Sequence, residues 1–234
     1  MAISRDVRSG ILKRAVQLLI VLLIIAASLF LSAGRLDWWN GWLFLGLYAT
    51  MIVCTGAILM RKDPELIAER ASLKKDAKSW DKLLAGVIGL YGPMVVWIVA
   101  GLHARYHWPG SISGPVQAAA GVALIVAGYS LVSWAMASNR FFSAVVRIQK
   151  DRDHCVVSGG PYHYVRHPGY VGMIVSTLGT PLLLGSAPAF APAVVTIGVA
   201  VLRTALEDRT LQLELEGYTG YAQRVKWRLL PGLW

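Results

Sequence analysis

The sequence is poor in charged residues and in cysteine. Aspartate, glutamate, lysine and arginine make up 15% of the 234 residues, whereas soluble domains carry about 25%. The two cysteines, Cys54 and Cys155, form no Cys-x-x-Cys pair and no metal-ligand spacing, so neither a disulfide framework nor a metal site is expected. A GxGxxG dinucleotide fingerprint is also missing. Hydrophobic residues instead reach 56%, in continuous runs too long for a soluble core.

These apolar runs predict an all-α fold, a polytopic integral membrane bundle. A helix needs about 20 apolar residues to cross a bilayer, and an open strand would leave backbone groups unpaired in lipid. Four runs reach that length: 15–33, 41–60, 83–102 and 116–137. Two shorter runs, 171–185 and 187–202, are expected to form a tight helical hairpin. About six spans are therefore predicted.

The formal net charge of +10 predicts an orientation in the membrane. Of the 23 basic residues, all but Arg35 and Arg105 fall in the segments 1–14, 61–82, 138–170 and 203–234. Because cytoplasmic loops carry the excess of lysine and arginine, both termini are expected in the cytoplasm. The same scattered pattern, without a basic stripe, argues against nucleic acid as a partner.

A dense polar cluster lies between the hydrophobic runs, in the stretch GGPYHYVRHPGYVG (159–172). Polar groups at a membrane are costly and usually mark a functional site. Because the hairpin returns the chain to the same side, 138–170 is expected to face 203–234. Arg203 and Glu207 are four residues apart, hence on one helix face; an ordinary surface ion pair is the alternative for these two. The cluster contains Tyr162, His163, Tyr164, Arg166, His167 and Tyr170.

The sequence GPYHYVRHPGYVG, a downstream helix with Arg203 and Glu207, and the ending YAQRVKWRLLPGLW together resemble the isoprenylcysteine carboxyl methyltransferase family, whose wider group includes phospholipid N-methyltransferases. The resemblance covers about residues 147–234. It implies a catalytic region that binds S-adenosyl-L-methionine, which we place over 138–234, after the bundle of four spans predicted from the apolar runs over 1–137. The implied cofactor-binding residues are Gln149, His154, Cys155, Val156, Val157, Tyr162, His167, Pro168, Gly169, Tyr170 and Glu207.

The implied roles agree with the chemistry of these side chains. His167 and Tyr170 can donate to the carboxylate of the cofactor, and Glu207 can pair with its ammonium. Tyr162 is expected near the adenine, with 154–157 as an apolar wall. Arg203 matches the position linked to the methyl acceptor, so Arg203 and Glu207 are the candidate catalytic residues.

The acceptor is expected to be a lipophilic small molecule or a lipidated chain that enters from the bilayer. A carboxylate is already ionised and needs no general base, and Arg203 can hold it by a bidentate pair. An amine would need a free lone pair, beside which an arginine is unhelpful. The pattern therefore favours O-methylation.

Three other functions stay open. They are a phospholipid amine N-methyltransferase, a reductase of the sterol reductase type that binds NADPH through Arg147, Lys150 and Arg152, and a non-catalytic membrane adaptor. The oligomeric state and the identity of the acceptor are left open.

Overall fold

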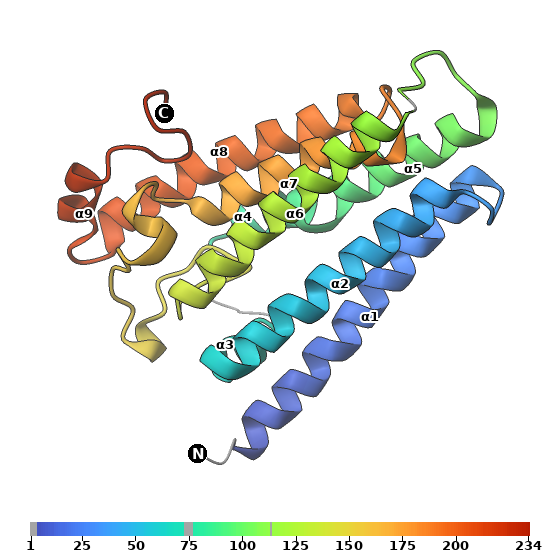
Figure 1. Cartoon of the computed structure of the whole chain (residues 1–234). Coiled ribbons are helices and arrows are strands. Elements are labelled where there is room, and N and C mark those ends of the chain that lie inside the picture. The colour runs from blue at the N-terminus through green and yellow to red at the C-terminus, as the bar shows by residue number, and fades with distance from the viewer. Residues whose placement is uncertain (1–3, 73–76, 113) are drawn as a thin grey trace.

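The computed structural model describes residues 4–72, 77–112 and 114–234, and the named elements in these ranges are helices (Figure 1). Short 3₁₀ turns cover Lys150–Arg152 and Gly160–His163. The longer elements are α1 (Arg5–Ala33), α2 (Trp39–Lys62), α3 (Pro64–Glu69), α4 (Asp81–Gly86), a π-helical turn (Val87–Tyr91), α5 (Gly92–Tyr106), α6 (Pro115–Ser138), α7 (Pro168–Leu184), α8 (Phe190–Glu214) and α9 (Tyr218–Arg224).

Within the described ranges, five helical stretches are long and apolar enough to cross a membrane. They are α1, α2, α6, α8 and the unbroken stretch Asp81–Tyr106, which joins α4 to α5. The prediction of a multi-pass membrane bundle is therefore confirmed. The helix expected to run on from the last apolar run, 187–202, and to carry Arg203 and Glu207 on one face is confirmed. α8 continues to Glu214 and has 25 residues, because the polar side chains of Arg203, Thr204 and Asp208 are buried against other segments. α7, with 17 residues, is short, as expected.

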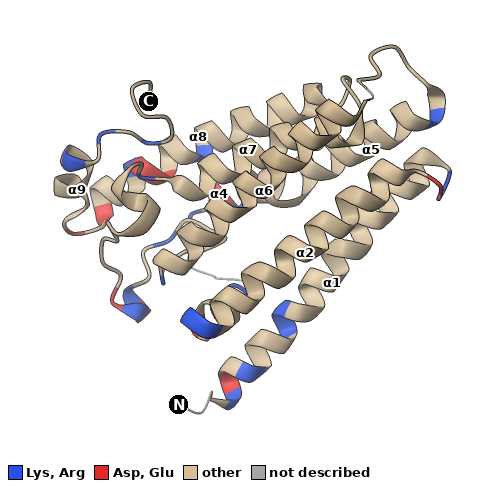
Figure 2. Ribbon diagram, viewed as in Figure 1, with Lys and Arg blue, Asp and Glu red and all other residues tan. Residues whose placement is uncertain are grey.

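The charged side chains gather at one end of the bundle, where the amino terminus, α3 and α9 lie (Figure 2). We call this the charged end. At the opposite end the connection between α1 and α2 contains Arg35 and Asp37, and the last turn of α5 contains Arg105. The predicted division of charge between the two sides of the bundle is thus visible in the fold, although Lys74 and Lys75 lie outside the described residues.

α6 and α7 pack closely through paired glycines. A Cβ on Gly128 would collide with the carbonyl oxygen of Gly172, and a Cβ on Gly179 would lie 2.8 Å from the carbonyl oxygen of Gly121. Small residues allow helix backbones to approach closely in lipid, where packing supplies much of the association energy. These contacts fix the position of α7, and hence of the polar residues at its start.

The sequence Asp63-Pro64-Glu65 is typical of a helix start and predicts an interfacial helix over residues 64–73, and α3 begins there. Asp63 caps it by accepting a hydrogen bond from the Leu66 amide at 3.0 Å, and Pro64 occupies the first turn. The predicted end of this helix, Leu73, lies outside the described residues, and α3 itself ends at Glu69.

The segments 138–170 and 203–234 face each other at the charged end, as predicted. The amide of Arg166 donates to the carbonyl of Trp227 at 2.9 Å, and the amide of His167 donates to that of Arg228 at 3.0 Å. The carboxyl-terminal tail therefore holds the stretch that leads into α7.

Candidate functional site

A cavity of about 420 Å³ opens at the charged end and continues between the helices. This volume lies in the range of small-molecule sites. Its polar part is formed by the loop 139–147, the segment 154–157, the start of α7 and the middle of α8. Its deeper part is apolar and aromatic, and is lined by Phe44, Tyr48, Trp97, Ile125 and Tyr129. A ligand with a polar head and an apolar tail matches this shape.

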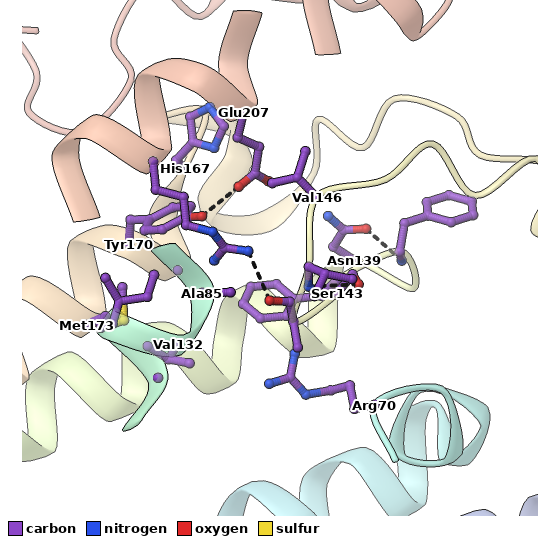
Figure 3. A pocket seen from close by; sticks show the side chains of 18 of the residues that line it. Arg70, Ala85, Val132, Asn139, Ser143, Val146, His167, Tyr170, Met173 and Glu207 are labelled. Atoms are coloured by element: carbon purple, nitrogen blue, oxygen red, sulfur yellow. Dashed lines mark hydrogen bonds between the residues drawn. The ribbon is translucent and has the colours of Figure 1, made fainter. Parts of the chain in front are cut away.

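Tyr170 and Glu207 meet at the polar part of the cavity (Figure 3). The Tyr170 hydroxyl donates to Glu207 Oε2 at 2.6 Å. Beside them, a Cβ on Gly169 would lie 2.8 Å from the Phe142 ring, so only glycine lets that ring close the wall. Two segments far apart in the sequence thus place a carboxylate and a phenol at one point.

Arg203 lines the same cavity but does not pair with Glu207. Its Nε donates to Asp81 Oδ1 at 2.6 Å and its Nη2 to Asp81 Oδ2 at 3.0 Å. Asp81 is fully buried and also accepts from the Val146 amide at 2.7 Å. The surface ion pair considered as an alternative for Arg203 and Glu207 is therefore wrong, because a carboxylate in α4 takes the guanidinium.

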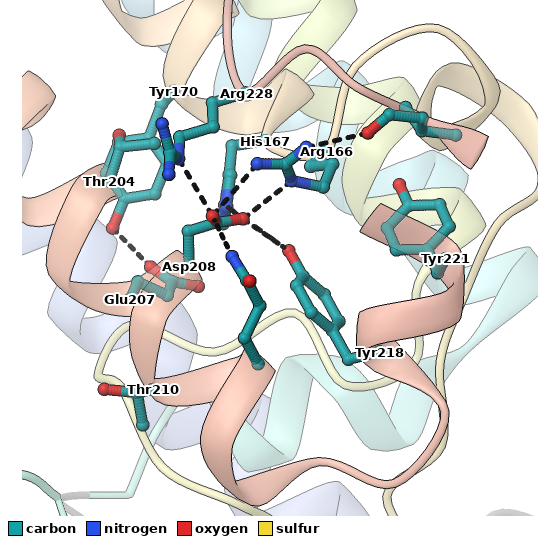
Figure 4. Close-up of polar contacts among 12 residues, drawn as sticks. Arg166, His167, Tyr170, Thr204, Glu207, Asp208, Thr210, Tyr218, Tyr221 and Arg228 are labelled. Carbon is teal, nitrogen blue, oxygen red and sulfur yellow. Dashed lines mark hydrogen bonds and ion pairs between the residues drawn. The ribbon is translucent and has the colours of Figure 1, made fainter. Parts of the chain in front are cut away.

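Asp208 is the centre of a buried polar network behind the cavity (Figure 4). Arg166 donates to its two oxygens at 2.7 and 3.0 Å, and Arg228 Nε donates to Oδ2 at 2.8 Å. The Tyr218 hydroxyl donates to Oδ1 at 3.0 Å, and His167 Nε2 lies 3.1 Å from the same oxygen. The network joins α8, α9, the tail and the start of α7. His167 is thus held by Asp208 while its side chain lines the cavity.

The segment 154–157 forms a second wall. The Gln149 amide donates to His154 Nδ1 at 3.3 Å, so the neutral imidazole carries its proton on Nε2. Burial, and then Arg147 and Arg152, lower the pKa of His154 to about 4. The ring is therefore neutral at physiological pH.

The aromatic groups around this wall stay protonated. Burial raises the pKa of Tyr162 above its usual range, and the Tyr221 hydroxyl donates to the carbonyl of Tyr162 at 2.7 Å. Val156, Val157, Leu215 and Tyr218 pack against Tyr162. The wall is apolar, with a phenol beside it.

The structure brings together most of the residues singled out by the sequence. His154, Cys155, Val156, Val157, Tyr162, His167, Gly169, Tyr170, Arg203 and Glu207 all line the cavity.

Gln149 and Pro168 are the exceptions, since neither is among the lining residues. The Gln149 side chain donates to the carbonyl of Phe141 at 2.6 Å and accepts from Arg152 at 2.8 Å, so it closes its own loop. Pro168 is buried in the first turn of α7. Within the polar cluster, His163 and Tyr164 are exposed.

Two charged residues at the site escaped the sequence analysis: Arg70, which lines the cavity, and Asp81, which pairs with Arg203. Asp81 carries a signal that was available, because an acidic residue at the start of an apolar run is costly and usually functional. Arg70 was counted only for orientation and has no local signal. Cys54 lies inside an apolar run, a pattern that predicts a buried side chain, but it is exposed.

Comparisons with known proteins agree with this geometry. Residues 121–213 match the isoprenylcysteine carboxyl methyltransferase (ICMT) family. A protein-S-isoprenylcysteine O-methyltransferase of Schizosaccharomyces pombe is 49% identical over 45 residues, which is 19% of each chain. Protein-S-isoprenylcysteine O-methyltransferase B of Arabidopsis thaliana is 32% identical over 108 residues, 45% of this chain and 55% of that protein. The matches thus span about half or less of these relatives.

The fold has a solved counterpart. The structure of the eukaryotic intramembrane Ras methyltransferase ICMT, solved without a monobody, superposes with a TM-score of 0.58 at 20% identity, over 90% of this chain and 73% of that one. This likeness shows the fold, and the matched residues contain the start of α7 together with Arg203 and Glu207. Residues 121–213 therefore carry a sequence similar to the isoprenylcysteine carboxyl methyltransferase family, and the chain shares the fold of a solved ICMT structure.

Proposed function

We propose that this protein is an integral membrane methyltransferase that uses S-adenosyl-L-methionine to methylate a lipophilic carboxylate, with an isoprenylated cysteine as the leading acceptor. The observation that carries the proposal is one continuous cavity. Tyr170 and Glu207 lie at its polar part, and aromatic side chains line its apolar part between the helices. The relatives named above are O-methyltransferases of isoprenylcysteine, which supports the acceptor.

The donor set fits the proposed cofactor. S-adenosyl-L-methionine presents an ammonium, a carboxylate, an adenine and a sulfonium. Glu207 would pair with the ammonium, and the imidazole of His167 and the phenol of Tyr170 would face the carboxylate. The neutral His154 and the protonated Tyr162, with the wall of Val156 and Val157, would hold the adenosyl part. Gln149 and Pro168 would act indirectly, by shaping the loops.

When bound, the cofactor supplies an electrophilic methyl group, which the acceptor oxygen takes as the carbon–sulfur bond breaks, leaving a methyl ester and S-adenosylhomocysteine. A carboxylate acceptor needs no deprotonation, so the protein need only orient the acceptor and exclude water. Arg203 and Arg70 both line the cavity. Arg203 is paired with Asp81, and the guanidinium group of Arg70 favours an anion over an amine. This distribution of charge favours O-methylation over phospholipid N-methylation.

We also propose that the charged end faces the cytoplasm, so that both termini lie there. The excess of lysine and arginine at this end supports this orientation. The cofactor would then enter from the cytoplasm and the acceptor from the bilayer.

Calorimetric titration of the detergent-purified protein with S-adenosylhomocysteine tests the cofactor. We expect binding to the wild type, loss of binding in Glu207→Ala, and unchanged binding in Glu216→Ala, whose side chain is exposed. A parallel titration with NADPH tests the reductase alternative. A folded protein that binds NADPH and not S-adenosylhomocysteine would reject the proposal.

Methyl-tritiated cofactor, incubated with membranes that contain the protein, tests the chemistry. A methyl ester releases volatile tritiated methanol in base, whereas an N-methyl group does not. We expect base-labile label in the lipid or protein fraction; base-stable label would identify an amine acceptor instead.

A further inference from the structure

Arg203 already has a carboxylate partner in the structure. Asp81 takes both its Nε and one Nη, and the carbonyl of Ala144 accepts from Nη2 at 2.9 Å. Both members of the pair are buried. A buried pair of this geometry largely neutralises its own charges. Arg203 is therefore well placed to hold α4 and the loop 144–146 against α8, and the carboxylate of Asp81 compensates much of its positive charge.

Arg70 reaches the same cavity from the other side (Figure 3). It follows the last residue of α3, and its guanidinium carbon lies 5.3 Å from the centroid of the Phe142 ring. In the part of the chain that the structure describes, its Nη1 is buried and has no hydrogen-bond partner. A buried donor without a partner carries a desolvation cost. A ligand that supplies a hydrogen-bond acceptor at this nitrogen would offset that cost.

The electrostatic surroundings of Arg70 also favour an anion. Burial, and then the neighbouring cations Arg14 and Arg203, lower the pKa of Arg70 to about 10. An anion bound at this point would stabilise the charged guanidinium and relieve the repulsion among the arginines.

The lining of the cavity next to Arg70 indicates which anion fits. Val132 and Met173 lie beside the polar part, and the cavity continues to the aromatic residues Tyr48, Trp97 and Tyr129. A ligand that places its charge at Arg70 has a long apolar path for the rest of the molecule. A planar carboxylate matches the paired donors of a guanidinium.

Building on the methyltransferase function proposed above, we propose that Arg70 binds the carboxylate of the lipophilic acceptor, while Arg203, held by Asp81, is a positioning residue that shapes the wall. The carboxylate of the acceptor would then lie between Arg70 and the Tyr170–Glu207 pair, and its apolar tail would lie in the aromatic part of the cavity. Specificity for an acid over its neutral analogue would come from α3 and its following residue, outside the matched family region of 121–213.

The test compares two probes in the same detergent by calorimetric titration: N-acetyl-S-farnesyl-cysteine and its carboxamide. We expect the wild type to prefer the carboxylate, and Arg70→Gln to bind it about 10- to 100-fold more weakly, the range for one charge-assisted hydrogen bond. Binding of the carboxamide should not change. Arg61→Gln, an exposed arginine at the end of α2, is the matched control and should behave as wild type.

S-adenosylhomocysteine binding, measured on the same preparations, reports folding and separates this proposal from the proposed function. If the wild type binds no S-adenosylhomocysteine, the methyltransferase function fails, whatever Arg70 does. If Arg70→Gln binds S-adenosylhomocysteine normally but keeps the full preference for the carboxylate, the role of Arg70 is refuted. Arg70→Lys, which keeps the charge, covers the case in which Arg70→Gln does not fold. It should retain part of the preference, and equal weakening for both probes would show a merely structural role.

Discussion

Replacing Asp208 with asparagine should destabilise the protein strongly. The carboxylate is fully buried and accepts from Arg166 through two hydrogen bonds, and Arg166 has a side-chain exposure of only 5%. The amide of the substituted side chain would keep one acceptor oxygen but would leave a buried guanidinium without its counter-ion. Removing one member of a buried ion pair costs about 3–5 kcal/mol. Arg228, one third exposed, adds little because water screens it.

The cost should be visible as a shift of the thermal midpoint in detergent. For a chain of this size, 1 kcal/mol corresponds to about 2–4 °C, so Asp208→Asn should melt at least about 6 °C below wild type. Intrinsic tryptophan fluorescence is suited to this measurement, since the chain has nine tryptophans.

The matched control is Asp37→Asn. Asp37 lies 3.6 Å from Arg35 at the opposite end, with 82% of its side chain exposed, and such a pair contributes at most about 1 kcal/mol. Its midpoint should stay close to wild type. If Asp208→Asn also melts within about 2 °C of wild type, Asp208 does not hold the tail and α9 in place, and our account of the network is wrong.

Three further predictions concern the walls of the cavity and the helix contacts. Gly169→Ala places a Cβ 2.8 Å from the Phe142 ring and should weaken S-adenosylhomocysteine binding in calorimetry, whereas Gly46→Ala, with no atom within 4 Å of its Cβ, should bind as wild type. Gly128→Ala should cost about 1–3 kcal/mol by overpacking α6 against the Gly172 carbonyl, and Gly198→Ala, in open space, should not lower the melting midpoint. The pKa of His154 falls from 6.5 to about 4 on folding. Between these pH values the imidazole is protonated in the unfolded chain and neutral in the folded one, so the free energy of unfolding should decrease as the pH drops from about 6.5 towards 4. His154→Phe should therefore lose less stability than wild type between pH 7 and pH 5, and equal losses would refute this role of His154.

The helices and the main site segment were predictable because their signals are local. Apolar runs of about 20 residues require helices in lipid. The stretch 159–172 indicates a functional site because polar side chains are energetically costly to place at a membrane. The continuation of α8 past residue 202 was predicted as a helix with Arg203 and Glu207 on one face. The burial of Arg203, Thr204 and Asp208 against other segments was not predictable in this way, because the local sequence there is polar.

The close packing of α6 and α7 had the same limit. Gly121 and Gly128 stand seven residues apart, as do Gly172 and Gly179. This spacing shows that each helix has a small face, but not that the two faces meet. The tertiary structure pairs them, and so sets where α7 begins at the cavity.

The sequence by itself determined that the protein lies in a membrane, where its helices run, at which end the basic residues concentrate, and which site residues surround His167 and Glu207. Hydropathy and residue chemistry act over short stretches, so these features can be recognised locally. Only the tertiary structure decided how the charges are paired. Asp81 stands 122 positions from Arg203, and Arg70, just after α3, and Glu207, in α8, line one cavity. Contacts at such separations depend on how the helices pack, which no local pattern specifies. They leave Arg203 paired with Asp81 and, among the described residues, Arg70 Nη1 without a hydrogen-bond partner.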